Sequence, residues 1–265
     1  MENGHRLARD RPNTTFLRNK MELNLNGKRA LVFASSEGIG KAIAESLVKE
    51  GAIVTICSRD EKKINQTAHE IGAHFALTCD LTLPGSAREV TQQVVDKFGG
   101  LDILVTNTGG PKKGRFLDVT LDQWKGDFQS LWLSVVESLH VALPVMEKNN
   151  FGRILMVTSV AAKEPLPELT TSNGLRPGLA GLAKSISNEY ASSGVTVNLI
   201  LPGYTNTQRL KDLKLSDDKI RSLIPAGRLG EPSEIGDLVS FLASPKGAYI
   251  NGQSLSVDGG ALKSI

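Results

Sequence analysis

A short glycine- and serine-containing turn near the start of the chain has the composition of a phosphate-binding loop. Residues 35–40, Ser-Ser-Glu-Gly-Ile-Gly, follow the apolar run 30–33 and lead directly into a segment with helical periodicity. Glycines let a pyrophosphate approach the backbone, and the N-terminus of a helix offers unpaired N–H groups and the positive end of a dipole. The pattern predicts a dinucleotide site, and a tight turn without a ligand is the alternative. The residues predicted to contact the cofactor here are Ser35, Ser36, Gly38, Ile39 and Gly40.

The end of the second apolar run bears on which dinucleotide is bound. An acidic residue there would bind the ribose hydroxyls of NAD and repel a 2′-phosphate, but Ser58 is neutral and Arg59 can pair with a phosphate. These two residues favour NADP(H) over NAD(H). Glu37 opposes that assignment, because its carboxylate would lie near the same phosphate. Arg59 could also be a solvated arginine that caps the loop.

Apolar runs rich in β-branched residues alternate with helical patterns along the chain, which is typical of a parallel sheet with crossover helices. The strand candidates are residues 30–33, 53–57, 75–79, 103–106, 154–158, 196–201 and 254–257. The helix candidates are residues 38–50, 61–71, 86–98, 121–149, 171–193 and 233–243. We therefore expect an α/β fold: one doubly wound (Rossmann) domain over residues 21–265, with about seven strands and helices on both faces.

Composition excludes several classes of protein. Residues 1–20 carry the whole formal charge of +3, because the rest of the chain has 26 basic and 26 acidic residues. The body is therefore not basic enough overall to indicate nucleic-acid binding. We expect residues 1–20 to be a disordered extension or an over-called start; an arginine-rich presequence is the less favoured alternative. No apolar run is long enough to span a membrane. Cys57 and Cys79 fit no metal or redox spacing, so we expect no metal and a reduced, cytoplasmic protein.

These features, with others downstream, resemble the short-chain dehydrogenase/reductase family. Its glycine motif reads Thr-Gly-x-x-x-Gly-x-Gly, and here Phe33 and Ala34 replace the Thr and the first Gly. The order and spacing of the other matches carry the resemblance almost to the C-terminus. The further cofactor contacts that it implies are Asp80 and Leu81 after the third strand, Asn107 and Gly109 after the fourth, and Pro202, Gly203, Thr205 and Thr207 in the loop that holds the nicotinamide in the family.

The family's catalytic residues are an Asn, a Ser, a Tyr and a Lys, and only the Ser is retained. Ser159 matches the family Ser, whereas Ser172 stands in place of Tyr, Arg176 in place of Lys and Leu131 in place of Asn. A serine is a far weaker acid than a phenol, and an arginine supplies charge and hydrogen bonds but no proton relay. Losing a positioned acid costs about 10²- to 10⁴-fold in rate. Arg176 can still bind a ribose or phosphate oxygen.

Three groups could compensate for the missing acid. Tyr204 lies in the loop that holds the nicotinamide in the family. Its phenol could act as the acid, or the side chain could merely pack that loop. Lys163 could face the cleft, or it is a surface lysine. Ser172 with Asn173 could polarise a carbonyl through water, or Ser172 caps the helix N-terminus.

Two functions from different classes follow. The resemblance implies an oxidoreductase that interconverts a carbonyl and a secondary alcohol, and the run 163–176 resembles a subgroup close to the 3-oxoacyl-carrier-protein reductases, so a 3-oxoacyl thioester is one candidate substrate. The alternative is a dinucleotide-binding protein without turnover, serving as a sensor, scaffold or silent subunit; a lyase or epimerase is a third possibility. The substrate itself cannot be derived from the sequence.

The resemblance also implies a homodimer or homotetramer, because the helices at 121–149 and 171–193 match those of the family's four-helix dimer contact. An apolar stripe at Leu131, Trp132, Val135 and Leu139 serves that contact or the core. The mixed charges of residues 209–222 predict a mobile lid over the substrate.

Overall fold

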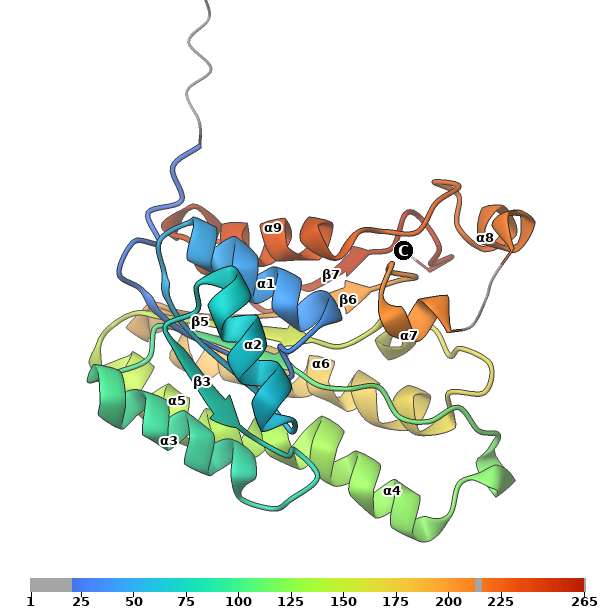
Figure 1. The fold of residues 1–265 in the computed structure, drawn as a ribbon, viewed down its shortest axis with the longest axis horizontal. Coiled ribbons are helices and arrows are strands. Elements are labelled where there is room, and N and C mark those ends of the chain that lie inside the picture. Colours follow the sequence, from blue (N-terminus) through green and yellow to red (C-terminus); the bar gives the residue numbers. More distant parts are fainter. Residues whose placement is uncertain (1–20, 213–215, 265) are drawn as a thin grey trace, which may run out of the picture.

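The computed structural model describes residues 21–212 and 216–264, which form one seven-stranded parallel sheet in the order β3-β2-β1-β4-β5-β6-β7 (Figure 1). The predicted doubly wound α/β fold is confirmed. Successive strands are added in one direction from β1 to β3 and in the opposite direction from β4 to β7. Folds of this kind bind ligands at the carboxyl ends of the strands where the order changes, here between β1 and β4. The strands are β1 (Arg29–Val32), β2 (Ile53–Ser58), β3 (Phe75–Thr78), β4 (Ile103–Asn107), β5 (Gly152–Val157), β6 (Val195–Pro202) and β7 (Ser254–Val257).

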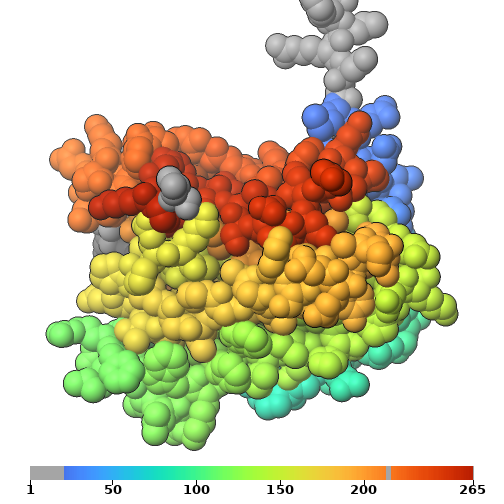
Figure 2. Space-filling view, turned by 180° about the vertical axis from the view of Figure 1, so that it is seen from behind, coloured from blue at the N-terminus to red at the C-terminus, as the bar shows by residue number. Residues whose placement is uncertain are grey.

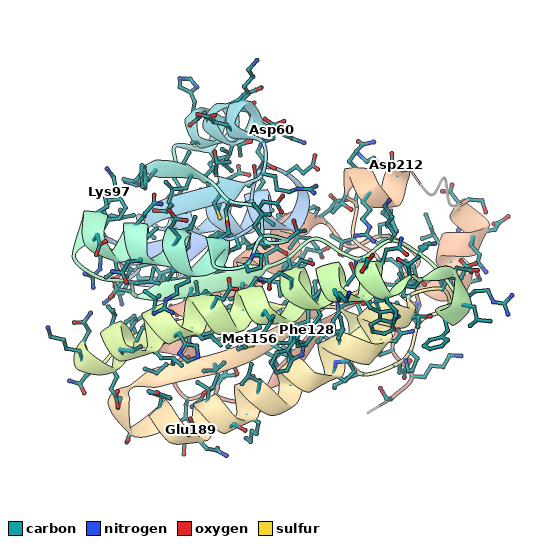
Figure 3. The ribbon with its side chains drawn as sticks, turned by 90° about the horizontal axis from the view of Figure 1, so that it is seen from below. Asp60, Lys97, Phe128, Met156, Glu189 and Asp212 are labelled. Carbon is teal, nitrogen blue, oxygen red and sulfur yellow. The ribbon has the colours of Figure 1, made fainter. Side chains whose placement is uncertain are left out.

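Helices cover both faces of the sheet and divide the core into two apolar layers. One layer lies under α1 (Gly38–Lys49), α2 (Glu61–Ile71) and α9 (Pro232–Ala243). The other lies under α3 (Ser86–Phe98), α5 (Ser134–Lys148) and α6 (Thr170–Tyr190), which run side by side when the molecule is seen from below (Figure 3). The central strands β4, β5 and β6 are buried along their whole length, as their continuous apolar sequence predicts.

The helix predicted at 121–149 is interrupted. It consists of α4 (Leu121–Phe128), a π-helical turn Gln129–Leu133 (η2) and α5. Leu131, at the position of the family's Asn, lies in the middle of that turn and is 2% exposed. A π-turn inserts one residue into the helical repeat and frequently marks a functional site.

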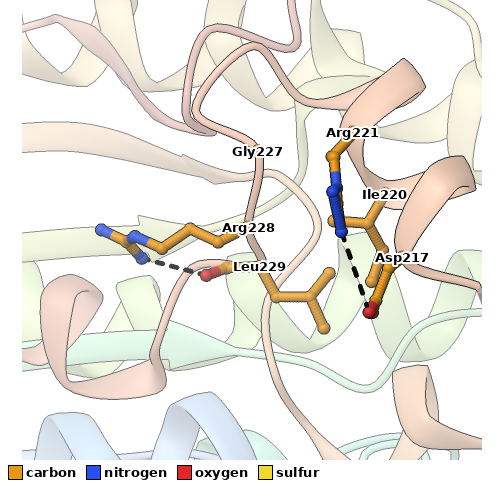
Figure 4. A pocket seen from close by; sticks show the side chains of 6 residues that line it. All are labelled: Asp217, Ile220, Arg221, Gly227, Arg228 and Leu229. Carbon is orange, nitrogen blue, oxygen red and sulfur yellow. Dashed lines mark hydrogen bonds and ion pairs between the residues drawn. The ribbon is translucent and has the colours of Figure 1, made fainter.

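The lid predicted at residues 209–222 contains two short helices, α7 (Gln208–Lys211) and α8 (Asp217–Leu223), at the carboxyl edge of the sheet (Figure 1). A cavity of about 330 Å³ lies between α8 and residues 227–229 (Figure 4). Its charged residues are paired among themselves or nearby: Arg221 with Asp217 at 3.9 Å, and Arg228 with Glu234 at 2.7 Å. The cavity therefore offers no unpaired charge to a ligand.

Three expectations from the sequence concern the N-terminal extension, membrane-spanning helices and metal sites. The extension predicted at residues 1–20 falls outside the described residues. None of the helices in the described ranges is long and apolar enough to cross a bilayer. Within the same ranges, no group of three or more His, Cys, Asp or Glu residues could hold a metal ion.

Candidate active site

The glycine loop is held in a shape that leaves its backbone open to a ligand. Ala34 has a φ of +46° and Gly38 a φ of +58°, both in the left-handed region. A Cβ at Gly40 would overlap the Ala34 carbonyl oxygen and lie 2.7 Å from the Asn107 amide nitrogen, so only glycine fits there. No side chain caps the N-terminus of α1. The cradle fits the pyrophosphate of a dinucleotide, which would meet the free N–H groups of this helix.

The two serines of the loop have structural contacts. Ser35 is fully buried, and its hydroxyl donates to the Val32 carbonyl at 2.7 Å and accepts from the Cys57 amide at 3.1 Å. The Ser35 hydroxyl therefore joins β1 to β2, and the predicted contact of Ser35 with the cofactor would have to come from its backbone. The Ser36 carbonyl accepts from Thr67 at 2.9 Å, which fixes the loop to α2.

Beside the loop, the ends of β2 and β3 form the predicted 2′-phosphate and adenine end of the site. Arg59 is exposed and contacts no carboxylate of the described residues. The Asp80 carboxylate accepts from the amide and the hydroxyl of Thr82, at 3.0 and 2.8 Å. Glu37 forms an ion pair with Lys63 at 2.6 Å. This pair weakens the argument that Glu37 repels a phosphate, and it brings to the site a lysine that the sequence pattern did not reveal.

At the other end, the loop after β6 approaches the glycine loop. The Thr207 methyl carbon lies 3.4 Å from the position that a Cβ on Gly38 would take. Thr205 is buried, and its hydroxyl donates to the Gly203 carbonyl at 3.2 Å. Pro202 is buried as the last residue of β6, Leu81 is half-buried and Gly109 is exposed after β4. The structure thus brings the two loops predicted to contact the cofactor to one edge of the sheet, with Asn107 tied to the glycine loop by a bond of 3.0 Å to the Ala34 carbonyl.

Ser159 stands directly after β5, where it begins a single 3-10 turn, Val160–Ala162 (η3). It is half-buried in extended backbone, and its oxygen accepts from the Ala161 amide at 3.1 Å. This bond orients the hydroxyl and leaves its proton free to be donated. The turn that Ser159 begins packs against α6, the helix that carries Ser172 and Arg176.

Ser172 and Arg176 lie one turn apart inside α6 and contact each other. The Arg176 Nε donates to the Ser172 hydroxyl oxygen at 3.0 Å, and the two side chains are 4% and 3% exposed respectively. Ser172 is the third residue of the helix, and Leu169 occupies the N-cap position. The alternative that Ser172 caps the helix is therefore wrong.

Arg176 carries a buried charge without a carboxylate partner among the described residues. Burial, helped by the charge of Arg209, lowers the pKa of Arg176 to about 10, so the guanidinium stays protonated at neutral pH. Arg209, from the first turn of α7, donates to the Pro111 carbonyl at 2.7 Å and lies against Gly110. From the sequence, Arg209 was predicted only as part of a charged lid. Its position near Arg176 becomes visible only in the folded structure.

The groups considered as substitutes for the missing acid differ in their availability. The Asn173 side chain bonds the Leu166 backbone twice, at 3.0 and 2.8 Å, so the prediction that Asn173 helps to polarise a carbonyl is wrong. Lys163 is exposed at the end of η3. Tyr204 is half-buried, and its phenol makes no hydrogen bond to another described residue.

Comparison with known proteins shows the family. A model described as enoyl-(acyl carrier protein) reductase, from the short-chain dehydrogenases/reductases, matches residues 33–261. The chain is a member of the short-chain dehydrogenase/reductase family. That Ala34, Leu131, Ser172 and Arg176 depart from the family's glycine motif and catalytic residues stays a prediction from the sequence.

Several relatives of this short-chain dehydrogenase/reductase are reductases. The 3-oxoacyl-[acyl-carrier-protein] reductase FabG of Vibrio cholerae is 36% identical over 241 residues, which is 90% of this chain and 98% of FabG. The NADPH-dependent reductase YwfH of bacilysin biosynthesis is 30% identical, with a TM-score of 0.86 over 91% of this chain and all of that one. A short chain oxidoreductase of Pseudomonas aeruginosa PAO1, solved with NADPH and described as containing an atypical catalytic center, is also 30% identical. Its TM-score is 0.84 over 90% of this chain and 98% of that one.

Proposed function

We propose that the protein is an NADP(H)-dependent reductase that interconverts a carbonyl and a secondary alcohol, using Ser159 and the Ser172/Arg176 pair. The observation that carries the proposal is the placement of Ser159, whose hydroxyl is oriented by the Ala161 amide and free to donate, next to the helix with the buried cation. The neutral Ser58, the exposed Arg59 and the neutralisation of Glu37 by Lys63 support NADP(H). So do the NADPH-bound and NADPH-dependent relatives.

The chain's own residues then have distinct tasks. NADPH, when bound, supplies the hydride. Ser159 donates a hydrogen bond to the substrate carbonyl, and Arg176 stabilises the developing alkoxide by its charge. The Ser172 hydroxyl, whose oxygen is held by Arg176 Nε, donates its proton toward the alkoxide and recovers one from solvent. In this arrangement the guanidinium acts by charge alone, because it is protonated throughout the physiological range.

A 3-oxoacyl thioester is one candidate substrate, supported by the FabG relatives. The second candidate function is a dinucleotide-binding protein without turnover. The observation in its favour is that the family's phenol is replaced by Ser172, whose oxygen is already occupied by Arg176.

The two candidates separate in one assay. The protein is mixed with NADPH and a panel of simple ketones and 3-oxoacyl thioesters, and NADPH oxidation is followed by absorbance. For a reductase we expect turnover that falls about 10²-fold in Ser159→Ala, since one oxyanion donor is lost. Ser185→Ala, an exposed serine on the outer side of α6, is the matched control and should leave the rate unchanged. Tight NADPH binding without turnover of any compound would reject the reductase and favour the binding protein.

We also propose that the chain forms a homodimer or homotetramer. Large apolar side chains gather on the segment from residue 116 to 133: Phe116, Leu117, Leu121, Phe128 and Leu133, of which Leu117 is 92% exposed. This segment lies beside α6 on the face seen in Figure 2, where both reach the surface. Exposed apolar patches of this kind mark association sites. Light scattering should give at least a dimer, and Leu121→Lys with Phe128→Lys should yield a monomer; a wild-type monomer would reject the proposal.

A further inference from the structure

The buried guanidinium of Arg176 has hydrogen-bonding capacity that the protein does not use. A guanidinium has five N–H donors, and the bond from Nε to Ser172 is the only hydrogen bond of this group to another described residue. A buried charge is costly unless a counter-charge meets it. Among the described residues no carboxylate does so, which indicates that the counter-charge arrives with a ligand.

Arg209 supplies a second guanidinium on the loop that also contacts the start of α6. Its terminal nitrogen donates to the Pro111 carbonyl at 2.7 Å, and the guanidinium covers Gly110 so closely that no side chain could stand there. Its charge is felt at Arg176, whose pKa it lowers in addition to the effect of burial. Arg209 itself is exposed, and an anion placed between the two like charges would be attracted by both of them.

The loop 108–114 is held on one side by Arg209 and on the other by the start of α6. The loop 108–114 leaves β4 at Asn107, receives Arg209 at Pro111, and joins the start of α6 through a bridge between Gly114 and Leu169. The Thr170 hydroxyl donates to the Gly114 carbonyl at 3.2 Å. Arg209 and the Ser172/Arg176 pair are thus held by one loop at the mouth of the site.

The cofactor does not account for both charges. The glycine loop offers the N-terminus of α1 to its pyrophosphate, and Arg59 and Lys63 lie at the end of β2. Two strands, β1 and β4, separate β2 from β5, which at ~4.8 Å per strand places that end roughly 14 Å from Ser159. A nicotinamide ribose beside Arg176 is neutral and could use hydrogen bonds but not two positive charges.

We propose that the substrate carries an oxyanion, a carboxylate or a phosphate, next to its reacting carbonyl, and that Arg176 and Arg209 bind it together. Guanidinium groups match such anions with paired charge-assisted hydrogen bonds. The inference rests on the proposed reductase function and narrows its substrate: small keto acids or ketone phosphates are favoured over uncharged ketones. Arg209 is then a specificity-determining residue, located in α7, which borders the cleft.

Binding to the NADP⁺ complex tests this inference without requiring turnover, because NADP⁺ cannot reduce a ketone. The protein saturated with NADP⁺ is titrated calorimetrically with acetoacetate and methyl acetoacetate, and with dihydroxyacetone phosphate and dihydroxyacetone. In at least one pair the anion should bind about 10-fold more tightly or better than its neutral partner, as expected for a hydrogen bond to a charged group. The pair that shows the preference identifies carboxylate or phosphate.

Variants assign the preference to Arg209. In Arg209→Met the preference should fall below about 3-fold, with Arg209→Lys in between, while the Kd of NADP⁺ stays within about 2-fold. Lys112→Met, an exposed lysine on the same loop, is the control and should keep the full preference. Equal affinity within both pairs, a preference that survives Arg209→Met, or an NADP⁺ affinity that falls in parallel would overturn the inference. Failure of the reductase proposal looks different: NADP⁺ does not bind, or NADPH is not oxidised with any substrate.

Discussion

Replacing Arg176 by methionine should stabilise the unliganded protein. Burial and the nearby Arg209 charge lower the pKa of Arg176 from its ordinary value to about 10, which at about 1.4 kcal/mol per pKa unit is a penalty of about 3 kcal/mol for keeping the group charged in the folded state. Methionine keeps most of the aliphatic stem. The Ser172 hydroxyl loses its donor, which costs about 1 kcal/mol.

The net expectation for Arg176→Met is a gain of about 2 kcal/mol in the free energy of unfolding. At 2–4 °C per kcal/mol for a chain of this size, Tm should rise by about 4–8 °C. The sign follows from linkage. The folded pKa lies below the unfolded one, so the destabilisation is fully present below pH 10 and disappears as the pH rises from about 10 toward the ordinary pKa of an arginine. The difference between wild type and variant should therefore be constant from pH 6 to 9.

Arg153 provides a control of the same type and burial. It is also 4% exposed, but it donates to the Gly152 and Gly194 carbonyls at 2.8 and 2.9 Å and lies 4.4 Å from the centre of the Phe151 ring. Burial lowers the pKa of Arg153 as well, but Arg153→Met should still lower stability by about 1–3 kcal/mol, because the two carbonyls lose a charged donor. Urea unfolding of both variants at equal protein concentration, without cofactor, measures the difference. If Arg176→Met is destabilised like Arg153→Met, the reasoning about an uncompensated charge is refuted.

Three further substitutions test the cofactor site. Ala34→Gly should raise the free energy of unfolding by about 0.5–1 kcal/mol in urea, because Ala34 has a φ of +46° that only glycine adopts without strain; a loss of stability would contradict this. Gly40→Ala should weaken NADPH binding at least about 10-fold in a fluorescence titration, since its Cβ would overlap the Ala34 carbonyl oxygen and displace the loop. Arg59→Ala should weaken NADPH binding about 10-fold and leave NADH binding unchanged, and an equal effect on both would show that Arg59 does not meet the 2′-phosphate.

Local sequence signals account for the parts of the fold that were predicted to the residue. The helix at 61–71 begins where the Asp60 side chain accepts from the Lys63 amide at 3.0 Å and ends at Gly72, whose φ is +72°. Such caps are visible in sequence because each depends on one residue type at one position. The π-turn at Gln129–Leu133 is not visible in this way, because its apolar residues continue the helical stripe on both sides.

The candidate site, too, has features that the local sequence shows and features that only the fold shows. Spacing placed Ser172 and Arg176 on one face of a helix, and the structure adds what spacing cannot contain: both are buried, and the loop 108–114 brings Arg209 to them from more than thirty residues away in sequence. Ser172 and Arg176, at the positions matched to the family's Tyr and Lys, form a hydrogen bond across one helical turn and provide a cation but no phenol. A site built in this way stabilises an oxyanion well and supplies a proton poorly. The same charge that weakens the apoprotein becomes favourable when an anion binds, so the unfavourable burial of Arg176 and the proposed preference for anionic carbonyl compounds have one physical cause.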